Sequence, residues 1–309
     1  MSVLNNLTEA SKEKQVDYIN SFDEVLLDVD GVIWLNSTPI QGAVDCVNNL
    51  KKLGKKIRYV TNNTIRSTPS IAKSLTERNF ITNAEDIVTP KETTIAYLDQ
   101  LNIKHKDIFI IGTENMKETL RNAGYKLLSD PPAVIEEGIS NTLSYYENNA
   151  NVGAVIIDFD FNFNFIKLQK AFWHLNQPNT AFIITLDDRL APVGDKGPII
   201  TQYFAAQALK EVTNKEPVLM GKPSDICINF IKEIFNIKDC SRTLFVGDSI
   251  TSDMSTGANA GFQKLLVLSG ISTIEDIKDW KHPEEYKPEY YINSLNDLND
   301  IIKVNFSLT

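Results

Sequence analysis

The order of apolar and polar positions along the chain predicts alternating strands and helices. From residue 21 onward, short apolar runs are followed by turns and then by segments whose apolar residues fall at helical spacing. This alternation is typical of a parallel β-sheet with helices on its faces, so the predicted fold class is α/β. Strands are expected at residues 24–28, 56–60, 243–246 and 265–268, and helices at residues 41–53, 224–235 and 254–260.

Two local signals mark helix ends. Gly54 follows the segment 41–53 and is a suitable residue to end that helix. Thr68 and Pro69 are suited to be the N-cap and the first position of the next helix.

The middle of the chain predicts a second α/β unit. Strands are expected at residues 108–111, 154–157 and 182–184, with helices centred on residues 117–122 and 167–175. The block is too long to be a connection within one sheet, so we interpret it as an inserted domain. The predicted division is residues 1–103 and 216–309 for the core and 104–215 for the insertion.

Composition and charge exclude several classes of protein. With 42% hydrophobic and 23% charged residues, the chain of 309 residues can bury a full core. Its formal charge of -9 argues against binding to nucleic acid or to an anionic membrane. Cys46, Cys227 and Cys240 are too few and too scattered for a disulfide framework or a zinc site. No signal peptide or membrane-spanning run is apparent, so a cytoplasmic location is expected.

The first candidate for chemistry is the segment Asp28-Val29-Asp30-Gly31 at the end of a predicted strand. Asp28 and Asp30 point the same way in an extended segment, because side chains alternate with period two. One carboxylate can attack phosphorus while the other handles the proton of the leaving group. A calcium-binding EF-hand loop is excluded, since its twelfth position would be Pro39 rather than glutamate.

Three further segments lie at strand ends or helix starts. Thr61, Asn62 and Asn63 offer a hydroxyl and amides to phosphate oxygens, and Lys222 can neutralise charge shared by nucleophile and phosphate. Asp248 suits a hard cation such as Mg²⁺. Asp253 either binds that metal directly or holds a water molecule and Lys222. Each segment alone is a weak signal, but all four fall where open α/β sheets bind their ligands.

Together these segments resemble the haloacid dehalogenase-like hydrolases, in particular the branch of p-nitrophenylphosphatases and phosphoglycolate phosphatases, which includes pyridoxal phosphatases. The most telling stretches are residues 28–34, 59–63, 152–155 and 221–223. The resemblance implies a Rossmann-like core with a large inserted α/β cap, a Mg²⁺ cofactor and hydrolysis of small phosphorylated metabolites.

The resemblance also implies individual roles. Asp28 is then the nucleophile, and Asp30 is the acid/base whose backbone carbonyl also meets the metal. Thr61, Asn62 and Asn63 bind phosphate, Lys222 neutralises charge, Asp28 and Asp248 hold the metal, and Asp253 supports them. Relatives are often homodimers through their caps, and the same assembly is expected here.

The sequence departs from the family pattern in two places. Ser249 and Thr251 stand where many relatives have Arg and a further Asp. In the cap, residues 184–187 and 198–201 stand in place of Thr-Asn-x-Asp and Pro-Gly-x-Gly, so the asparagine and both glycines of these two motifs are missing. Asp187 and Arg189 of this loop are the candidates for substrate specificity.

Two other functions are compatible with an α/β fold of this kind. A catalytically weak regulatory or phospho-ligand-binding protein on the same fold is the alternative, and the intact core motifs count against it. A nucleotide-dependent oxidoreductase is excluded, because acids replace the glycine-rich turn that would bind pyrophosphate. His174 is expected to be packed rather than catalytic, and the aromatic run 159–165 is expected to be a strand end and loop over the cap.

Overall fold

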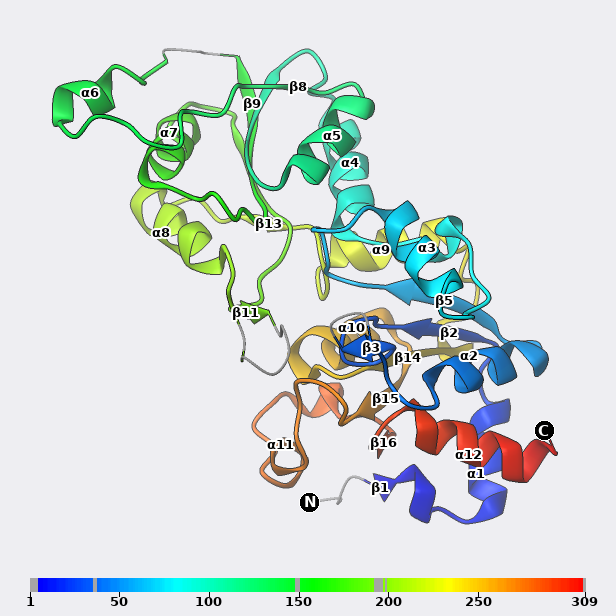
Figure 1. Ribbon diagram of the computed structural model, residues 1–309. Coiled ribbons are helices and arrows are strands. Elements are labelled where there is room, and N and C mark those ends of the chain that lie inside the picture. Colours follow the sequence, from blue (N-terminus) through cyan, green and yellow to red (C-terminus); the bar gives the residue numbers. More distant parts are fainter. Residues whose placement is uncertain (1–4, 36–37, 148–150, 192–196, 198, 308–309) are drawn as a thin grey trace.

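The computed structural model describes residues 5–35, 38–147, 151–191, 197 and 199–307 of the chain. Two separate sheets, in each of which all strands are parallel, form the centres of two α/β units (Figure 1). This arrangement confirms the predicted α/β class with a Rossmann-like core. The unit built on the larger sheet is called the core below, and the unit built on the smaller sheet is called the cap.

The core sheet has seven strands, and its central strands match the predicted ones closely. Their order across the sheet is β1 (Asn5–Asn6), β16 (Tyr290–Ile292), β15 (Gln263–Val267), β14 (Thr243–Gly247), β2 (Glu24–Leu27), β5 (Lys56–Val60) and β6 (Ile87–Val88). Asp28, which the sequence placed in the first strand, lies just beyond it. Neighbours β14 and β5 flank β2, so the ends of these three strands lie side by side.

Helices cover both faces of the core sheet, which explains why its strands are continuous apolar runs. Val25 and Leu27 of β2 belong to the cluster that packs against α1 (Lys12–Asn20), α2 (Ala43–Lys52) and α12 (Leu295–Phe306). Leu26 points to the opposite face, where it packs in a cluster with residues of α9 (Asp225–Ile234) and α10 (Ser255–Ala260). Alternation along the strand therefore serves two buried faces.

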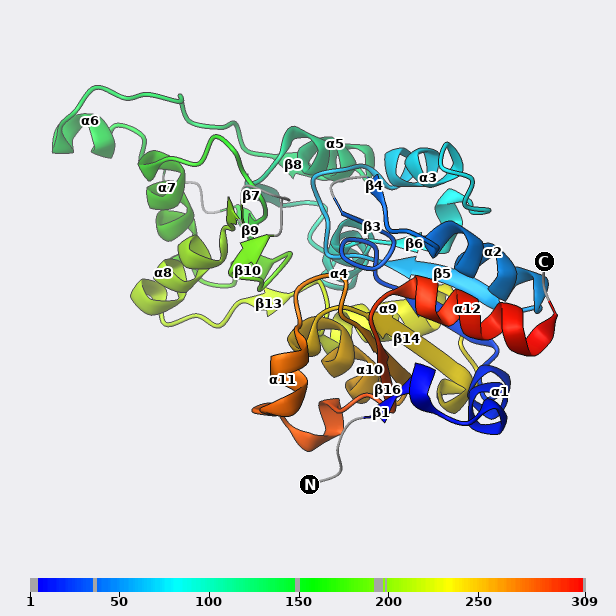
Figure 2. The ribbon, with the colours of Figure 1, turned by 60° about the horizontal axis from the view of Figure 1, so that its bottom comes forward.

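The cap sheet lies apart from the core sheet and carries its own helices (Figures 1 and 2). Its strand order is β13 (Val218–Leu219), β10 (Ala181–Ile184), β9 (Val152–Ile157), β7 (Asp107–Ile111) and β8 (Lys126–Leu127). One face packs against α4 (Pro90–Gln100) and α5 (Glu114–Asn122), and the other against α7 (Phe165–Leu175) and α8 (Tyr203–Thr213).

Two features lie near the expected domain boundaries. Leu98 of α4, assigned by sequence to the core, packs in an apolar cluster of the cap. Strand β13, which follows residue 215, pairs with β10 in the cap sheet. The chain therefore leaves the cap sheet only at Leu219, three residues before Lys222. The division into 1–103, 104–215 and 216–309 remains a prediction.

The remaining elements are short, and one helix start differs from the sequence prediction. Helix α3 (Thr68–Thr76) has Ser67, not Thr68, as its N-cap, because the Ser67 hydroxyl accepts a hydrogen bond from Ser70 N at 3.3 Å. The Thr68 hydroxyl instead donates to Glu92. Other short elements are β3 (Trp34–Leu35), β4 (Thr38–Pro39), β11 (Leu190–Ala191), β12 (Ile199–Ile200), α6 (Ile139–Leu143) and α11 (Ile274–Lys278). Within the described residues, no helix has the length and apolarity needed to cross a membrane.

The aromatic run 159–165 begins in the protein interior and then emerges from it. Phe159 is buried, whereas Phe161 and Phe163 are exposed. His174 is packed as predicted, with its ring 5.2 Å from that of Phe109. Neither imidazole nitrogen has a hydrogen-bond partner among the residues that the structure describes, and burial lowers the pKa of His174 to about 4.

The buried imidazole should make the protein less stable in mild acid. His174 is held neutral in the fold but takes up a proton near pH 6.5 in the unfolded chain. Its contribution to stability is therefore complete above pH 6.5 and is lost as the pH falls towards 4. We expect His174→Leu to remove about 2 kcal/mol of this acid sensitivity. Urea unfolding of both proteins at pH 7 and pH 4.5 measures it, and an identical pH dependence would contradict the expectation.

Candidate active site

The structure brings the four predicted segments to one cavity between core and cap. Asp28 follows β2, Thr61 follows β5 and Asp248 follows β14, so all three lie at the carboxyl edge of the core sheet. Lys222 arrives from the cap strand β13. The cavity is lined by all four residues and also by residues of the cap.

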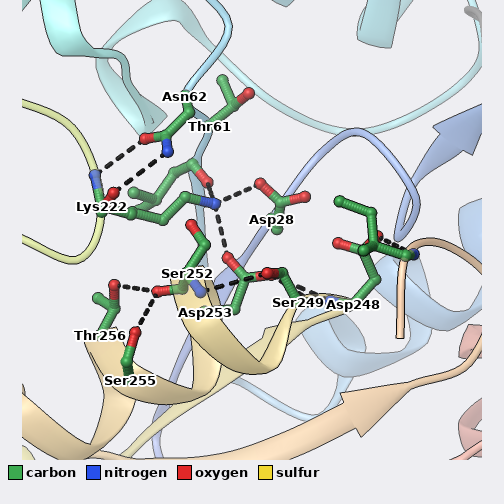
Figure 3. Close-up of polar contacts among 12 residues, drawn as sticks. Asp28, Thr61, Asn62, Lys222, Asp248, Ser249, Ser252, Asp253, Ser255 and Thr256 are labelled. Carbon is green, nitrogen blue, oxygen red and sulfur yellow. Dashed lines mark hydrogen bonds and ion pairs between the residues drawn. The ribbon is translucent and has the colours of Figure 1, made fainter. Parts of the chain in front are cut away.

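Lys222 lies at the centre of the site. Its Nζ atom donates to Asp28 Oδ1 at 2.5 Å, to Asp253 Oδ1 at 2.7 Å and to Val60 O at 3.0 Å (Figure 3). These bonds use all three donors of the ammonium group. Burial by itself would lower the pKa of Lys222, but the Asp253 and Asp28 carboxylates outweigh this effect and raise it. The lysine is therefore held in its charged form.

Asp253 is fully occupied by donors from the protein. Its Oδ1 atom accepts from Lys222, and its Oδ2 atom accepts from the backbone N–H groups of Asp248 and Ser249, both at 3.0 Å. A π-helical turn, Ile250–Met254, precedes α10 and carries this carboxylate; the sequence predicted only a regular helix from residue 254. The geometry favours a supporting role for Asp253 over direct metal binding.

The acidic groups fit a hard divalent cation. Oxygens of Asp28, Asp248 and Asp253 lie within 4.8 Å of one another, and all three residues are buried. Three carboxylates and one ammonium leave a net charge of -2 (-3 + 1), which is costly to bury without a further cation. Burial, and next the Asp253 charge, raises the pKa of Asp248 to about 7. Burial also raises the pKa of Asp28, although Lys222 opposes the shift. Carboxylate oxygens are the ligands that Mg²⁺ prefers.

Glycines pack closely against Asp248 and fix its position. A Cβ atom on Gly31 would lie 2.3 Å from Asp248 Oδ2, and one on Gly270 would lie 1.8 Å from the same oxygen. Gly31 also has a positive φ of +90°. The backbone N–H of Ile271 donates to Asp248 Oδ2 at 2.7 Å. Within the described part of the chain no hydrogen bond engages Asp248 Oδ1, which therefore stays available to a ligand.

Asn62 holds the lysine loop in place. Its Oδ1 atom accepts from Lys222 N at 2.9 Å, and its Nδ2 atom donates to Lys222 O at 3.3 Å. The same Nδ2 donates to Asp188 Oδ2 at 3.2 Å. The side-chain amide of Asn62 is thus engaged by the protein, and the phosphate-binding role expected of this turn remains a prediction. Thr61 is buried beside it, and its hydroxyl accepts from Asn63 N at 3.1 Å.

Asp30 is oriented by two neighbours. The indole Nε1 of Trp34 donates to Asp30 Oδ1 at 2.9 Å, and Asn63 Nδ2 donates to Asp30 Oδ2 at 3.3 Å. Trp34 belongs to the motif that the sequence singled out, although no role was given to it. An indole four residues after an acid in a tight turn is the signal that could have been used.

On the cap side, the structure brings Asp188 to the cavity rather than the predicted candidates. Asp187 and Arg189 are exposed and do not line it, and Arg189 lies over the ring of Tyr203. Asp188 does line it, and burial raises its pKa while the Asn62 hydrogen bond opposes the shift. In the loop 185–201, residues 192–196 and Pro198 lie outside the described residues.

In the core, Ser249 and Thr251 are the two positions that depart from the family pattern. The Ser249 hydroxyl accepts from Ser252 N at 3.2 Å, and the Thr251 hydroxyl lies 3.4 Å from it.

Comparison with known proteins agrees with this geometry. The family model described as haloacid dehalogenase-like hydrolase matches residues 25–126, and the one described as HAD-hydrolase-like matches residues 219–298. Phosphoglycolate phosphatase 1A, chloroplastic, of Arabidopsis thaliana is 30% identical over 282 residues, which cover 90% of this chain and 77% of the relative. The 4-nitrophenylphosphatase of Schizosaccharomyces pombe is 29% identical over 297 residues, which cover 94% of this chain and 97% of that relative.

A solved structure shows the same likeness. The p-nitrophenyl phosphatase from Archaeoglobus fulgidus superposes with a TM-score of 0.75 at 28% identity, covering 91% of this chain and 99% of that protein. The chain belongs to the haloacid dehalogenase-like hydrolases, in the branch with the 4-nitrophenylphosphatases and phosphoglycolate phosphatases, and is a phosphoric monoester hydrolase. The resemblance predicted from the sequence is thereby confirmed.

The packing of Gly31 leads to a test with a matched control. Gly31 and Gly54 both have positive φ, but a Cβ on Gly54 would meet nothing within 4 Å. Backbone strain should cost about 1 kcal/mol of stability for alanine at either position, and the clash with Asp248 should add to this cost at Gly31 alone. Only Gly31→Ala should displace Asp248, and we expect its hydrolysis of p-nitrophenyl phosphate to fall at least about tenfold relative to Gly54→Ala. Equal activities of the two variants would show that this contact does not position Asp248.

Proposed function

We propose that this hydrolase is a magnesium-dependent phosphatase that cleaves small phosphate monoesters through an aspartyl-phosphate on Asp28. The observation that carries the proposal is the placement of Asp28 against the buried Lys222 ammonium, at 2.5 Å, on the floor of a cavity that the cap covers. The names of the relatives support the substrate class, since they act on p-nitrophenyl phosphate or phosphoglycolate.

In the first step a carboxylate oxygen of Asp28 attacks phosphorus, and the bond between phosphorus and the ester oxygen breaks. Asp30 gives its proton to the departing alkoxide, which leaves as the alcohol. Trp34 and Asn63 orient Asp30 for this transfer. Lys222 holds Asp28 in position and offsets the negative charge of the transferring group.

In the second step the aspartyl-phosphate is hydrolysed. Asp30, now a carboxylate, takes a proton from a water molecule as the water oxygen attacks phosphorus. The bond to Asp28 breaks, inorganic phosphate leaves, and Asp30 is again protonated. The presence of a base that lines the same cavity as the nucleophile supports turnover rather than stable storage of the phosphoryl group.

Asp28, Asp248 and the backbone carbonyl of Asp30 would hold the Mg²⁺ ion, with Asp253 behind them. When bound, Mg²⁺ neutralises the carboxylates and the phosphate oxygens that must approach one another. The excess of negative charge among the described residues of the site supports this assignment.

Replacing the nucleophile tests the covalent route. We expect Asp28→Asn to lower the turnover of p-nitrophenyl phosphate by roughly 10³-fold or more, because the amide keeps the shape of the side chain but is a poor nucleophile. Asp17→Asn, the same change at an exposed position of α1, serves as the control and should leave turnover unchanged. Circular dichroism checks that both variants fold. Substantial turnover by purified Asp28→Asn would refute the role of Asp28.

Removal of the metal tests the cofactor. Activity should vanish in excess chelator and return with Mg²⁺, whereas Ca²⁺ should restore it poorly because its larger, looser coordination shell disfavours in-line geometry. Mg²⁺ should also raise the melting temperature of the wild type, since it binds only the folded protein. That rise should be smaller in Asp248→Asn. Full activity in excess chelator would overturn the assignment.

A further inference from the structure

Asp158 is a buried residue that joins the cap to the core. It lies just beyond β9 and is only 1% exposed. Its Oδ1 atom accepts hydrogen bonds from the hydroxyls of Thr64 and Thr185, both at 2.6 Å. Thr185 follows β10 of the cap, whereas Thr64 belongs to the core loop that follows β5. One oxygen atom therefore binds side chains of both units.

The cap sheet fixes the position of this side chain. The backbone N–H of Asp158 donates to Ile111 O at 2.7 Å, and that of Thr185 donates to Ile157 O at 3.1 Å. Both bonds continue the pairing of the parallel strands beyond their last paired residues. A Cβ atom on Gly112 would lie 3.2 Å from Asp158 Cβ, so the end of β7 leaves little room for the side chain to move. Asp158 is therefore anchored to the cap sheet.

The core end of the contact lies in the turn that orients the proposed acid/base. Asn63 Oδ1 accepts from the backbone N–H groups of residues 65 and 66, at 3.1 and 3.3 Å, so its side chain closes a turn around Thr64. The Nδ2 atom of the same side chain donates to Asp30 Oδ2 at 3.3 Å. A displacement of Thr64 would therefore change the orientation of the amide that holds Asp30.

Burial makes a carboxylate costly at this place. It raises the pKa of Asp158, and the rise is opposed first by the hydroxyl of Thr185 and then by that of Thr64, by the backbone N–H of Phe159 and by the Lys91 ammonium. The Oδ2 atom is buried without a hydrogen-bond partner among the described residues. The side chain is thus stabilised mainly by the two contacts that join core and cap.

From these contacts we propose that Asp158 is a positioning residue for the phosphatase reaction. By binding Thr64 it keeps the amide of Asn63 directed at Asp30, and by binding Thr185 it ties this alignment to the position of the cap. Asp158 does not line the catalytic cavity, so it acts through these neighbours and not on the substrate. The proposal rests on the acid/base role given to Asp30 above. Loss of the contact should weaken proton transfer to the leaving group in particular.

Phenyl phosphate and p-nitrophenyl phosphate distinguish proton transfer from general damage. The two esters differ little in shape, but phenolate is the more basic leaving group and depends more on a proton from Asp30. The quantity measured is the ratio of kcat/KM for p-nitrophenyl phosphate to that for phenyl phosphate. Thr64→Val keeps the shape of the side chain and removes its hydroxyl, so this ratio should rise at least about threefold. Both esters are assayed on one preparation, so the ratio does not depend on the fraction of protein that is folded.

Further variants connect the effect to Asp158. Asp158→Ala should raise the ratio as Thr64→Val does, and the double variant should raise it no further, because both changes remove the same hydrogen bond. Asp158→Asn keeps an oxygen that can accept from both hydroxyls, so its ratio should stay close to that of the wild type. Thr180→Val is the matched control and should leave the ratio unchanged, since the Thr180 hydroxyl donates to Val152 O at 3.0 Å within the cap.

The wild type separates this inference from the function on which it rests. If the wild type hydrolyses neither ester in Mg²⁺, the phosphatase proposal fails, and the role of Asp158 fails with it. If both esters are hydrolysed but the ratio rises in only one of Thr64→Val and Asp158→Ala, or in neither, the role of Asp158 alone is refuted. A fall in kcat/KM by the same factor for both esters would show that Asp158 only stabilises the fold. A rise in both variants, with none in Thr180→Val, supports the proposal.

Discussion

The site depends on the buried ion pairs that the ammonium group of Lys222 forms with Asp28 and Asp253. Two ionised carboxylates are costly to bury this close together without a cation, and burial without acidic partners favours the uncharged form of a lysine. The three charged groups therefore stabilise one another in the buried site. Asp253 also accepts hydrogen bonds from the backbone N–H groups of Asp248 and Ser249, and Asn62 accepts one from the backbone N–H of Lys222. The geometry of the whole floor of the cavity follows from one pair of contacts.

The core and the cap contribute different properties to this cavity. The core supplies charge on strand ends that are held rigidly by a sheet packed on both faces. The cap supplies an apolar wall and a single described carboxylate. The two surfaces of the cavity thus come largely from separate parts of the chain, and they are joined by the hydrogen bond between Asn62 and Asp188. Selectivity in such a site reflects differences in the binding of the alcohol group rather than of the phosphate.

Much of this arrangement could be predicted from the sequence, because buried parallel strands are continuous apolar runs and ligand-binding residues follow their ends. That rule located Asp28, Thr61, Lys222 and Asp248. It failed to distinguish Asp187 from Asp188, since the direction of a side chain after β10 depends on the turn and not on the pattern. It also gave no indication that the Asn62 amide binds the Lys222 backbone, because that contact joins segments 160 residues apart. The predicted start of α3 was displaced by one residue, since Ser67 and Thr68 are both suitable capping residues by type.

The pairing of β13 in the cap sheet limits how the cap can be replaced by another domain. Lys222 stands on the chain segment that leaves this strand, and Met220 is bonded both to Ile184 of β10 and, through its carbonyl, to Thr93 of α4. The cap therefore cannot be exchanged without regard to the reactive centre. A replacement cap would have to end in a strand that places a lysine against Asp28 and Asp253, so the structures of the two parts constrain each other.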